Sequence, residues 1–265
     1  EPEELCSGDA DPYDKFMAYA RTIPYTLRNP LFHWTHLELK RYFGIDTLLN
    51  ETTAPEIWKK ANAALEQKDH STWGILERHK VKMIGTTDDP IDDLSAHKKL
   101  ARSTCPARVL PSFRPDSAYA LNDLQTWNKW TDQLAAASGI ECTNLANFKQ
   151  ALLQRIKHFK SLGCVASDHG LSHCPEKIAS DSEATKIFEH ARKGQKDSNE
   201  YSIAPDHIEA FTGHLLCWLG EQYKKNAWVM QLHLGAIRNV NRFIYHSYGA
   251  DAGCDSIDDT PQIKG

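Results

Sequence analysis

The sequence predicts an α/β fold with a parallel sheet, and two observations support this. Eight segments have apolar residues at three- and four-residue spacing, which is typical of amphipathic helices. Four short apolar runs lie among them, and each run ends in polar residues. Helical sequence separates each run from the next, so the pattern favours repeated β-α-β units.

The predicted helices are long and account for most of the chain. Apparent starts lie at Thr53 or Pro55, at Asn122, at Thr143 and at Pro205, residue types that favour the beginning of a helix. The helices are expected over residues 11–21, 31–43, 54–67, 92–102, 121–137, 143–161, 182–193 and 205–226.

The predicted strands have one apolar face and become polar toward their carboxyl ends. Successive residues of a strand point to opposite faces, so His233 lies opposite Leu232, and His169 lies opposite Asp168. A barrel with an active site at the carboxyl ends of its strands would have this pattern, and so would a doubly wound open sheet. The strand runs are residues 81–87 (VKMIGTT), 108–114 (RVLPSFR), 164–169 (CVASDH) and 228–235 (WVMQLHLG).

Composition excludes several classes of protein. The chain has 265 residues, 41% of them hydrophobic, and a formal net charge of −4, which provides no basic surface for nucleic acid or an anionic membrane. Seven cysteines without close spacing favour reduced thiols in a cytoplasmic protein. No signal peptide or membrane span is evident. The chain begins at Glu1 and ends on Ile-Lys-Gly, and we expect both ends to be truncated.

Polar motifs follow the first two strand runs. Asp88 lies in GTTDDP at 85–90, where its carboxylate is expected either to orient a ligand hydroxyl or to cap the next helix. Arg114 and Asp116 lie in FRPD at 113–116. They are expected either to form an internal ion pair or to present the arginine to a substrate carboxylate.

Histidines follow the last two strand runs. Asp168 and His169 form a candidate acid–base or metal-proximal pair, although a lone histidine of this kind is more often a structural residue. His233, with Arg238 just beyond it, suits a substrate that carries both hydroxyls and a carboxylate; the alternative is a buried histidine bonded to backbone. His33 and His36 are spaced to share a helix face, either as metal ligands or simply in packing.

Taken together, these motifs closely resemble the uronate isomerase family. The resemblance rests on YTLRNP at 25–30 followed by FHWTHLEL at 32–39, and on GTTDDP, FRPD, ASDHGL at 166–171 and LHLGA at 232–236. Arg238-Asn239 and the final stretch GADAGCDSI at 249–257 also fit the family. The likeness extends from about residue 11 to residue 260.

The resemblance implies part of a (β/α)₈ TIM-type barrel of the amidohydrolase superfamily, with a large added helical region. Residues 1–80 would form a helical region leading into the barrel. Residues 81–265 would form about strands two to five, with a helical insertion around 175–226. The implied reaction interconverts D-glucuronate and D-fructuronate, and D-galacturonate and D-tagaturonate, by moving a proton between C2 and C1.

The resemblance also implies roles for particular residues. His233 and His169 are the candidate catalytic residues, and the substrate-binding candidates are Arg114, Arg238, Asp116, Asp168 and Asp88. The implied partner is a small-molecule sugar acid, and a homo-oligomer is possible. The implied cofactor is a divalent metal, expected to be zinc. The family holds it with a His-x-His motif and an Asp-x-Arg aspartate, and this chain has neither motif.

Two other functions remain open from the sequence. One is a metal-dependent hydrolase of the same superfamily, and the other is a catalytically inactive fragment or scaffold that lacks the metal site. The 265 residues by themselves are expected to be inactive, because a three-point metal site needs its ligands.

Overall fold

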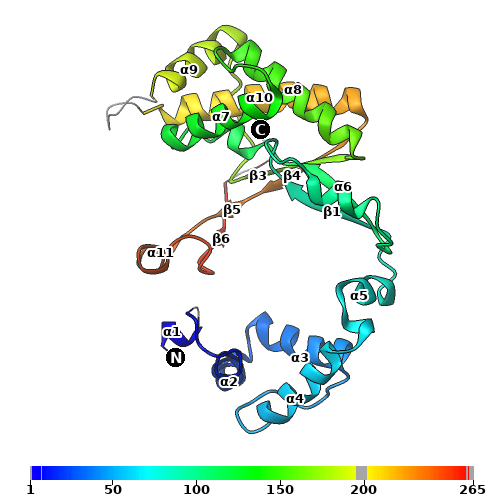
Figure 1. The fold of residues 1–265 in the computed structure, drawn as a ribbon. Coiled ribbons are helices and arrows are strands. Elements are labelled where there is room, and N and C mark those ends of the chain that lie inside the picture. The colour runs from blue at the N-terminus through cyan, green and yellow to red at the C-terminus, as the bar shows by residue number, and fades with distance from the viewer. Residues whose placement is uncertain (1, 7, 195–201, 261, 263–265) are drawn as a thin grey trace. The chain divides into compact units, whose positions relative to one another are not determined.

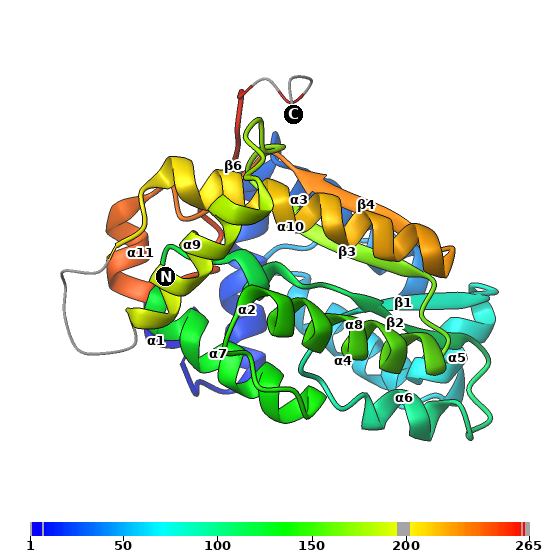
Figure 2. The same cartoon turned by 90° about the horizontal axis from the view of Figure 1, so that it is seen from above.

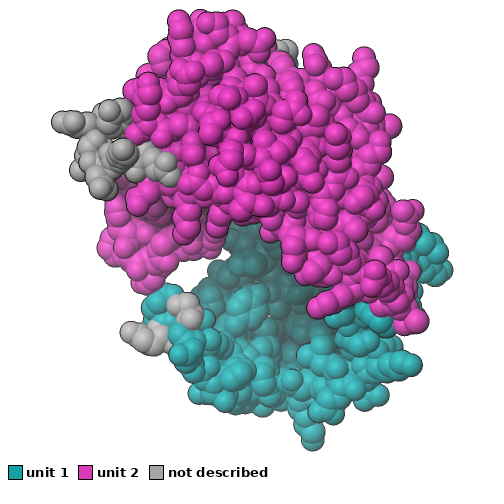
Figure 3. All heavy atoms as spheres, turned by 45° about the horizontal axis from the view of Figure 1, so that its top comes forward, with its two compact units in different colours: residues 1–82 teal, residues 83–265 magenta. Residues whose placement is uncertain are grey.

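The computed structural model describes residues 2–6, 8–194, 202–260 and 262. The chain forms two compact units, residues 1–82 and residues 83–265, which Figure 3 shows in different colours. No helix in the described ranges is long and apolar enough to cross a membrane. All seven cysteines are free.

Unit 1 is helical. Its small core contains Ile23, Leu39, Leu49 and Ile57, each less than a tenth exposed. Asn29 caps the central helix by accepting a hydrogen bond from the backbone N–H of Leu31. The elements are α1 (Glu3–Cys6), α2 (Pro12–Thr22), η1 (Ile23–Thr26), α3 (Pro30–Phe43), α4 (Ala54–Leu65), η2 (Lys68–His70) and α5 (Thr72–Arg78).

Unit 2 has a four-stranded parallel sheet in the order β1-β2-β3-β4. This confirms the predicted α/β class with a parallel sheet. The outer pairs, β1 with β2 and β3 with β4, each share six register positions, whereas β2 and β3 meet only where Phe113 pairs with Ser167. The strands are β1 (Met83–Asp88), β2 (Arg108–Phe113), β3 (Ala166–Leu171) and β4 (Val229–Leu234).

Four long helices pack against one face of this sheet (Figures 1 and 2). Their shared core contains several aromatic side chains that are fully buried, among them Phe113 from β2 and Phe148 from α8. The helices of unit 2 are α6 (Ser95–Leu100), η3 (Asp116–Tyr119), α7 (Leu124–Ser138), α8 (Leu145–Ser161), α9 (Asp181–Lys193), α10 (Pro205–Asn226) and α11 (Arg242–Tyr248). On β4, Val229, Gln231, Leu232 and His233 are all exposed, so Leu232 does not lie on a buried apolar face as the alternation predicted.

A two-stranded antiparallel ribbon follows β4. It consists of β5 (Ala236–Ile237) and β6 (Ser256–Ile257), with α11 between them. Gly235, at the start of the ribbon, has a φ of +89°, a left-handed conformation that glycine adopts without a steric penalty. Its N–H donates to the carbonyl oxygens of Leu171 and Ser172, which ties the ribbon to the end of β3.

Several sequence-based boundaries need correction. The α7 and α8 caps are Asp123 and Asn144, each one residue later than the predicted starts. The helix predicted over 92–102 covers only Ser95–Leu100. The strand predicted over 108–114 ends one residue earlier, at Phe113, and a 3₁₀ turn begins at Asp116.

Candidate functional site

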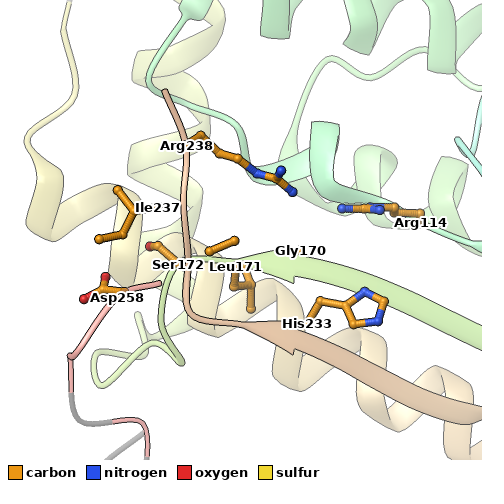
Figure 4. A pocket seen from close by; sticks show the side chains of 9 residues that line it. Arg114, Gly170, Leu171, Ser172, His233, Ile237, Arg238 and Asp258 are labelled. Atoms are coloured by element: carbon orange, nitrogen blue, oxygen red, sulfur yellow. The ribbon is translucent and has the colours of Figure 1, made fainter. Parts of the chain in front are cut away.

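A cavity of about 600 Å³ lies at the carboxyl ends of β3 and β4 (Figure 4). Ligand pockets of this size hold small organic molecules. In this view the guanidinium groups of Arg114 and Arg238 point toward one another, and the ring of His233 lies nearby. The cavity is lined by Arg114, Gly170, Leu171, Ser172, His233, Ala236, Ile237, Arg238 and Asp258.

Arg114 is held by carboxylates rather than left free. Its Nε donates to Asp116 Oδ2 at 2.8 Å, and its Nη1 lies 3.4 Å from Asp168 Oδ2. Hydrogen bonding to Asp116 raises the pKa of Arg114 above its usual value, although burial opposes this. The internal ion pair, one of the two alternatives from the sequence, therefore exists. The guanidinium still lines the cavity, so the pair also orients it toward a ligand.

Asp116 is fully occupied in holding neighbouring groups. Its Oδ2 accepts hydrogen bonds from Arg114 and from the backbone N–H of Gly170 at 3.0 Å. Its Oδ1 accepts from the Tyr119 hydroxyl at 2.5 Å. Asp116 does not line the cavity. Its contacts indicate that it positions Arg114 and does not meet a ligand itself.

Gly170 provides the space in which Arg114 lies. A Cβ atom at this position would come within 2.3 Å of Arg114 Nη2 and 3.1 Å of Asp116 Oδ2. Real side chains do not pack that closely, so only glycine lets the guanidinium lie over β3. The glycine in the ASDHGL motif is thus explained by close approach of a side chain.

Asp168 and His233 meet on the face of the sheet that carries the cavity. His233 Nδ1 lies 2.7 Å from Asp168 Oδ1, and the histidine side chain is 66% exposed whereas the aspartate side chain is 5% exposed. The two atoms are close, but they do not form a well-aligned ring N–H···O hydrogen bond, because Asp168 Oδ1 is buried without a hydrogen-bond partner among the described residues. A histidine beside a carboxylate can serve as a base or as a hydrogen-bond acceptor toward a ligand.

Arg238 completes the polar lining from the ribbon. It forms an ion pair with Asp255, which also accepts the backbone N–H of Asn239 at 3.0 Å. These bonds hold the pKa of Asp255 below its usual value. The position of Arg238 therefore depends on the pairing of β5 with β6.

Two candidates from the sequence lie away from the cavity. His169 is fully buried on the opposite face of β3 from Asp168, with Nδ1 3.3 Å from the Tyr119 hydroxyl. Burial lowers the pKa of His169 to about 4, so the ring is neutral near pH 7. Asp88 accepts from the Thr86 hydroxyl at 2.6 Å and lies 3.8 Å from His97. It neither lines this cavity nor caps the helix that follows.

The metal-ligating side chains of the described residues do not fit a divalent metal. Within the described ranges there is no cluster of three or more His, Cys, Asp or Glu side chains that could hold one. The two oxygens of Asp168 face Arg114 and His233. Both ring nitrogens of His36 are hydrogen-bonded to the backbone. Nδ1 lies 2.6 Å from the carbonyl oxygen of Phe32, and Nε2 accepts the backbone N–H of Leu49. This argues against His33 and His36 as a metal pair.

Sequence reasoning missed several residues that form or support the site. Tyr119 bonds to Asp116, Ser172 and Asp258 line the cavity, and Asp255 holds Arg238. Ser172 directly follows the ASDHGL motif, which was a usable signal. Asp258 comes from the far strand of the ribbon, and nothing in its local sequence places it near β3.

Comparison with known proteins agrees with the resemblance seen in the sequence. Residues 1–265 match the family model described as glucuronate isomerase. Uronate isomerases from Solibacter usitatus and from Caldanaerobacter subterraneus subsp. tengcongensis are each 44% identical over 98% of this chain. The alignments cover 55% and 54% of those proteins, so the chain spans about half the length of these relatives.

Solved structures match the fold as well. The crystal structure of uronate isomerase from Thermotoga maritima has a TM-score of 0.88 and 30% identity, covering 98% of this chain and 55% of that one. Glucuronate isomerase from Caulobacter crescentus has a TM-score of 0.84 at 24% identity and supports the fold alone. The family predicted from the motifs is confirmed, and this chain belongs to the glucuronate isomerase family.

Proposed function

We propose that the whole protein to which this chain belongs is a uronate isomerase. It would interconvert D-glucuronate with D-fructuronate, and D-galacturonate with D-tagaturonate. The observation that carries the proposal is the cavity at the ends of β3 and β4, where two arginines and an aspartate-oriented histidine gather. A hexuronate carries one carboxylate and several hydroxyls, which match this set of groups in charge and hydrogen bonding.

The proposed roles follow from the geometry. Arg114 is oriented by Asp116 and would bind the substrate carboxylate through its terminal nitrogens, with Arg238 as the second cation. His233 lies with Nδ1 2.7 Å from Asp168, so Nε2 is the nitrogen that would accept and return a proton at a sugar hydroxyl. The fully buried His169 would support the site from behind β3 through Tyr119, which lies between His169 and Asp116.

The sheet is proposed to be part of a (β/α)₈ barrel. Its strands follow chain order without reversal, and α7 to α10 cover one face. A doubly wound sheet instead reverses its strand order at a switch point and carries helices on both faces, so these features favour the barrel. The helices α9 and α10, between β3 and β4, correspond to the proposed helical insertion.

Family membership favours the isomerase over a metal-dependent hydrolase, because the matched relatives are named uronate isomerases. Zinc is the metal that we propose for the whole protein, with ligands outside this chain. A cytoplasmic location and a homo-oligomeric state complete the proposal.

The test is ketose formation from glucuronate by the full-length protein. His233→Asn is expected to lower kcat by about 10²–10⁴-fold, the usual range for loss of an acid–base group. His207→Asn is the matched control, because His207 is exposed at the start of α10 and lies outside the cavity. Wild-type turnover that survives unchanged in His233→Asn would refute the role of His233, and no turnover by the wild type would refute the function.

A further inference from the structure

Asp89 lies outside the cavity but is hydrogen-bonded to η3, the turn that begins with Asp116. It directly follows β1, and its two oxygens accept hydrogen bonds from three segments of the fold. Oδ1 accepts from Trp130 Nε1 on α7 at 2.8 Å and from the backbone N–H of Ile91 at 3.1 Å. Oδ2 accepts from the hydroxyl of Ser117 in η3 at 2.9 Å.

The loop that carries Asp89 is fixed on its other side by a buried arginine. Arg155 on α8 is 6% exposed and donates only to backbone carbonyls in its hydrogen bonds. Its Nε donates to Pro90 O at 2.6 Å, its Nη2 to Asp92 O at 2.8 Å and its Nη1 to Ala137 O at 3.1 Å. The loop after β1 is therefore anchored to the helical layer. This fixes the position of Asp89, which accepts the hydrogen bond from Ser117.

Ser117 connects this anchored loop to the arginine of the cavity. It follows Asp116, whose Oδ2 accepts both Arg114 Nε and the N–H of Gly170. The backbone N–H of Arg114 also donates to Asp88 O at 2.9 Å. A shift of η3 would move Asp116, and the Arg114 guanidinium would move with it.

We propose that Asp89 is a positioning residue that fixes η3 through Ser117 and thereby sets where Arg114 presents its guanidinium. The effect of Asp89 on substrate binding rests on the proposed function. Its effect on the position of Arg114 does not depend on that function.

The geometry also distinguishes this role from a chemical one. Asparagine at position 89 can keep every hydrogen bond. Its Oδ1 accepts from Trp130 and Ile91, and its Nδ2 donates to Ser117 Oγ once the serine hydroxyl turns round. Burial raises the pKa of Asp89, although the hydrogen bonds that its carboxylate accepts oppose this. A positioning role therefore needs the shape of the side chain, whereas an acid–base or ligand role would need its carboxylate.

The experiment compares Asp89→Ala, Asp89→Asn and Ser117→Ala in the full-length protein. Loss of the link at Ser117 is expected to raise KM for glucuronate about tenfold in Asp89→Ala and severalfold in Ser117→Ala, because about 1–1.5 kcal/mol of hydrogen bonding is lost. The value of kcat should change less, and Asp89→Asn should stay within about twofold of wild type.

Asp123→Ala is the matched control. Asp123 caps α7 by accepting the N–H of Thr126 at 3.1 Å, and it has no hydrogen bond to η3. Its loss should lower stability by about 1 kcal/mol without changing KM. This separates a positioning effect from general destabilisation, which lowers the active fraction and leaves KM unchanged.

Two results would overturn the inference: a wild-type KM in Asp89→Ala, or an Asp89→Asn variant as impaired as Asp89→Ala. If the wild-type protein does not isomerise uronates, the proposed function fails and crystal structures of both variants decide the inference instead. The inference is supported if Arg114 is displaced in Asp89→Ala but not in Asp89→Asn. It is overturned if Arg114 has not moved in either variant.

Discussion

A single methyl group at Gly170 should disable the candidate site without unfolding the protein. In Gly170→Ala the new Cβ would lie 2.3 Å from Arg114 Nη2, whereas non-bonded carbon atoms prefer separations of about 3.5–4.0 Å. The guanidinium must therefore move by at least about 1 Å. Because the clash is with the far end of a flexible side chain, the backbone can stay in place.

The expected consequence is a loss of substrate binding. A charge-assisted hydrogen bond contributes about 1.5–3 kcal/mol, so a displaced Arg114 should raise KM for glucuronate by roughly 10- to 150-fold. The free energy of unfolding should change by less than about 1 kcal/mol, because the helical core is untouched. Steady-state kinetics and chemical denaturation of the full-length variant measure the two quantities.

Gly220→Ala is the matched control. Its Cβ would lie 3.7 Å from Met230 Sδ, an ordinary contact, and α10 should gain about 0.5–1 kcal/mol from alanine in a helix. KM should stay at the wild-type value. A Gly170→Ala protein that is folded and has an unchanged KM would refute the reasoning that Arg114 lies over β3 and binds the carboxylate.

Three further predictions concern buried groups that do not line the cavity. The folded-state pKa of His169 is about 4, below the unfolded value of 6.5, so the unfolded chain binds more protons between these values and stability rises with pH across that window. His169→Gln should lose this rise in the free energy of unfolding, which amounts to about 3 kcal/mol. If the free energy of unfolding changes equally with pH in the wild type and the variant, the prediction is wrong. Arg155→Met leaves three carbonyls without their donor and should lower the free energy of unfolding by about 3 kcal/mol, whereas Arg108→Met, at an exposed position, should change it by less than about 0.5 kcal/mol. Tyr119→Phe removes one of the donors to Asp116 and should raise KM severalfold, and an unchanged KM would show that the other bonds suffice.

Much of the fold could be predicted because its long helices have regular apolar spacing and its strands are short apolar runs. A predicted helix start is one residue too early where two possible capping residues are adjacent, as at Asn122 and Asp123. In α6 the predicted start fails because Leu94 adopts a left-handed φ of 56°. The seven-residue helices α5 and α11 were missed because two turns contain too few apolar positions to show a period.

The site was less predictable than the fold. The direction in which a side chain points and the residues to which it bonds both depend on tertiary structure. Alternation placed Asp168 and His169 on opposite faces of β3, but only the tertiary structure shows that His169 is the one that faces the helices, where it contacts Tyr223. GTTDDP contains two adjacent aspartates with different hydrogen-bond partners. Asp88 accepts from the Thr86 hydroxyl, whereas Asp89 accepts from the Ser117 hydroxyl. Asp258 reaches the cavity only because the ribbon folds back after Gly235.

The most direct test of the central claim is a crystal structure of the full-length protein with glucuronate bound. We expect the sugar acid in the cavity at the ends of β3 and β4, with its carboxylate on the Arg114 guanidinium and a hydroxyl within hydrogen-bond distance of His233. Glucuronate bound elsewhere, with Arg114 and His233 making no contact to it, would contradict the account.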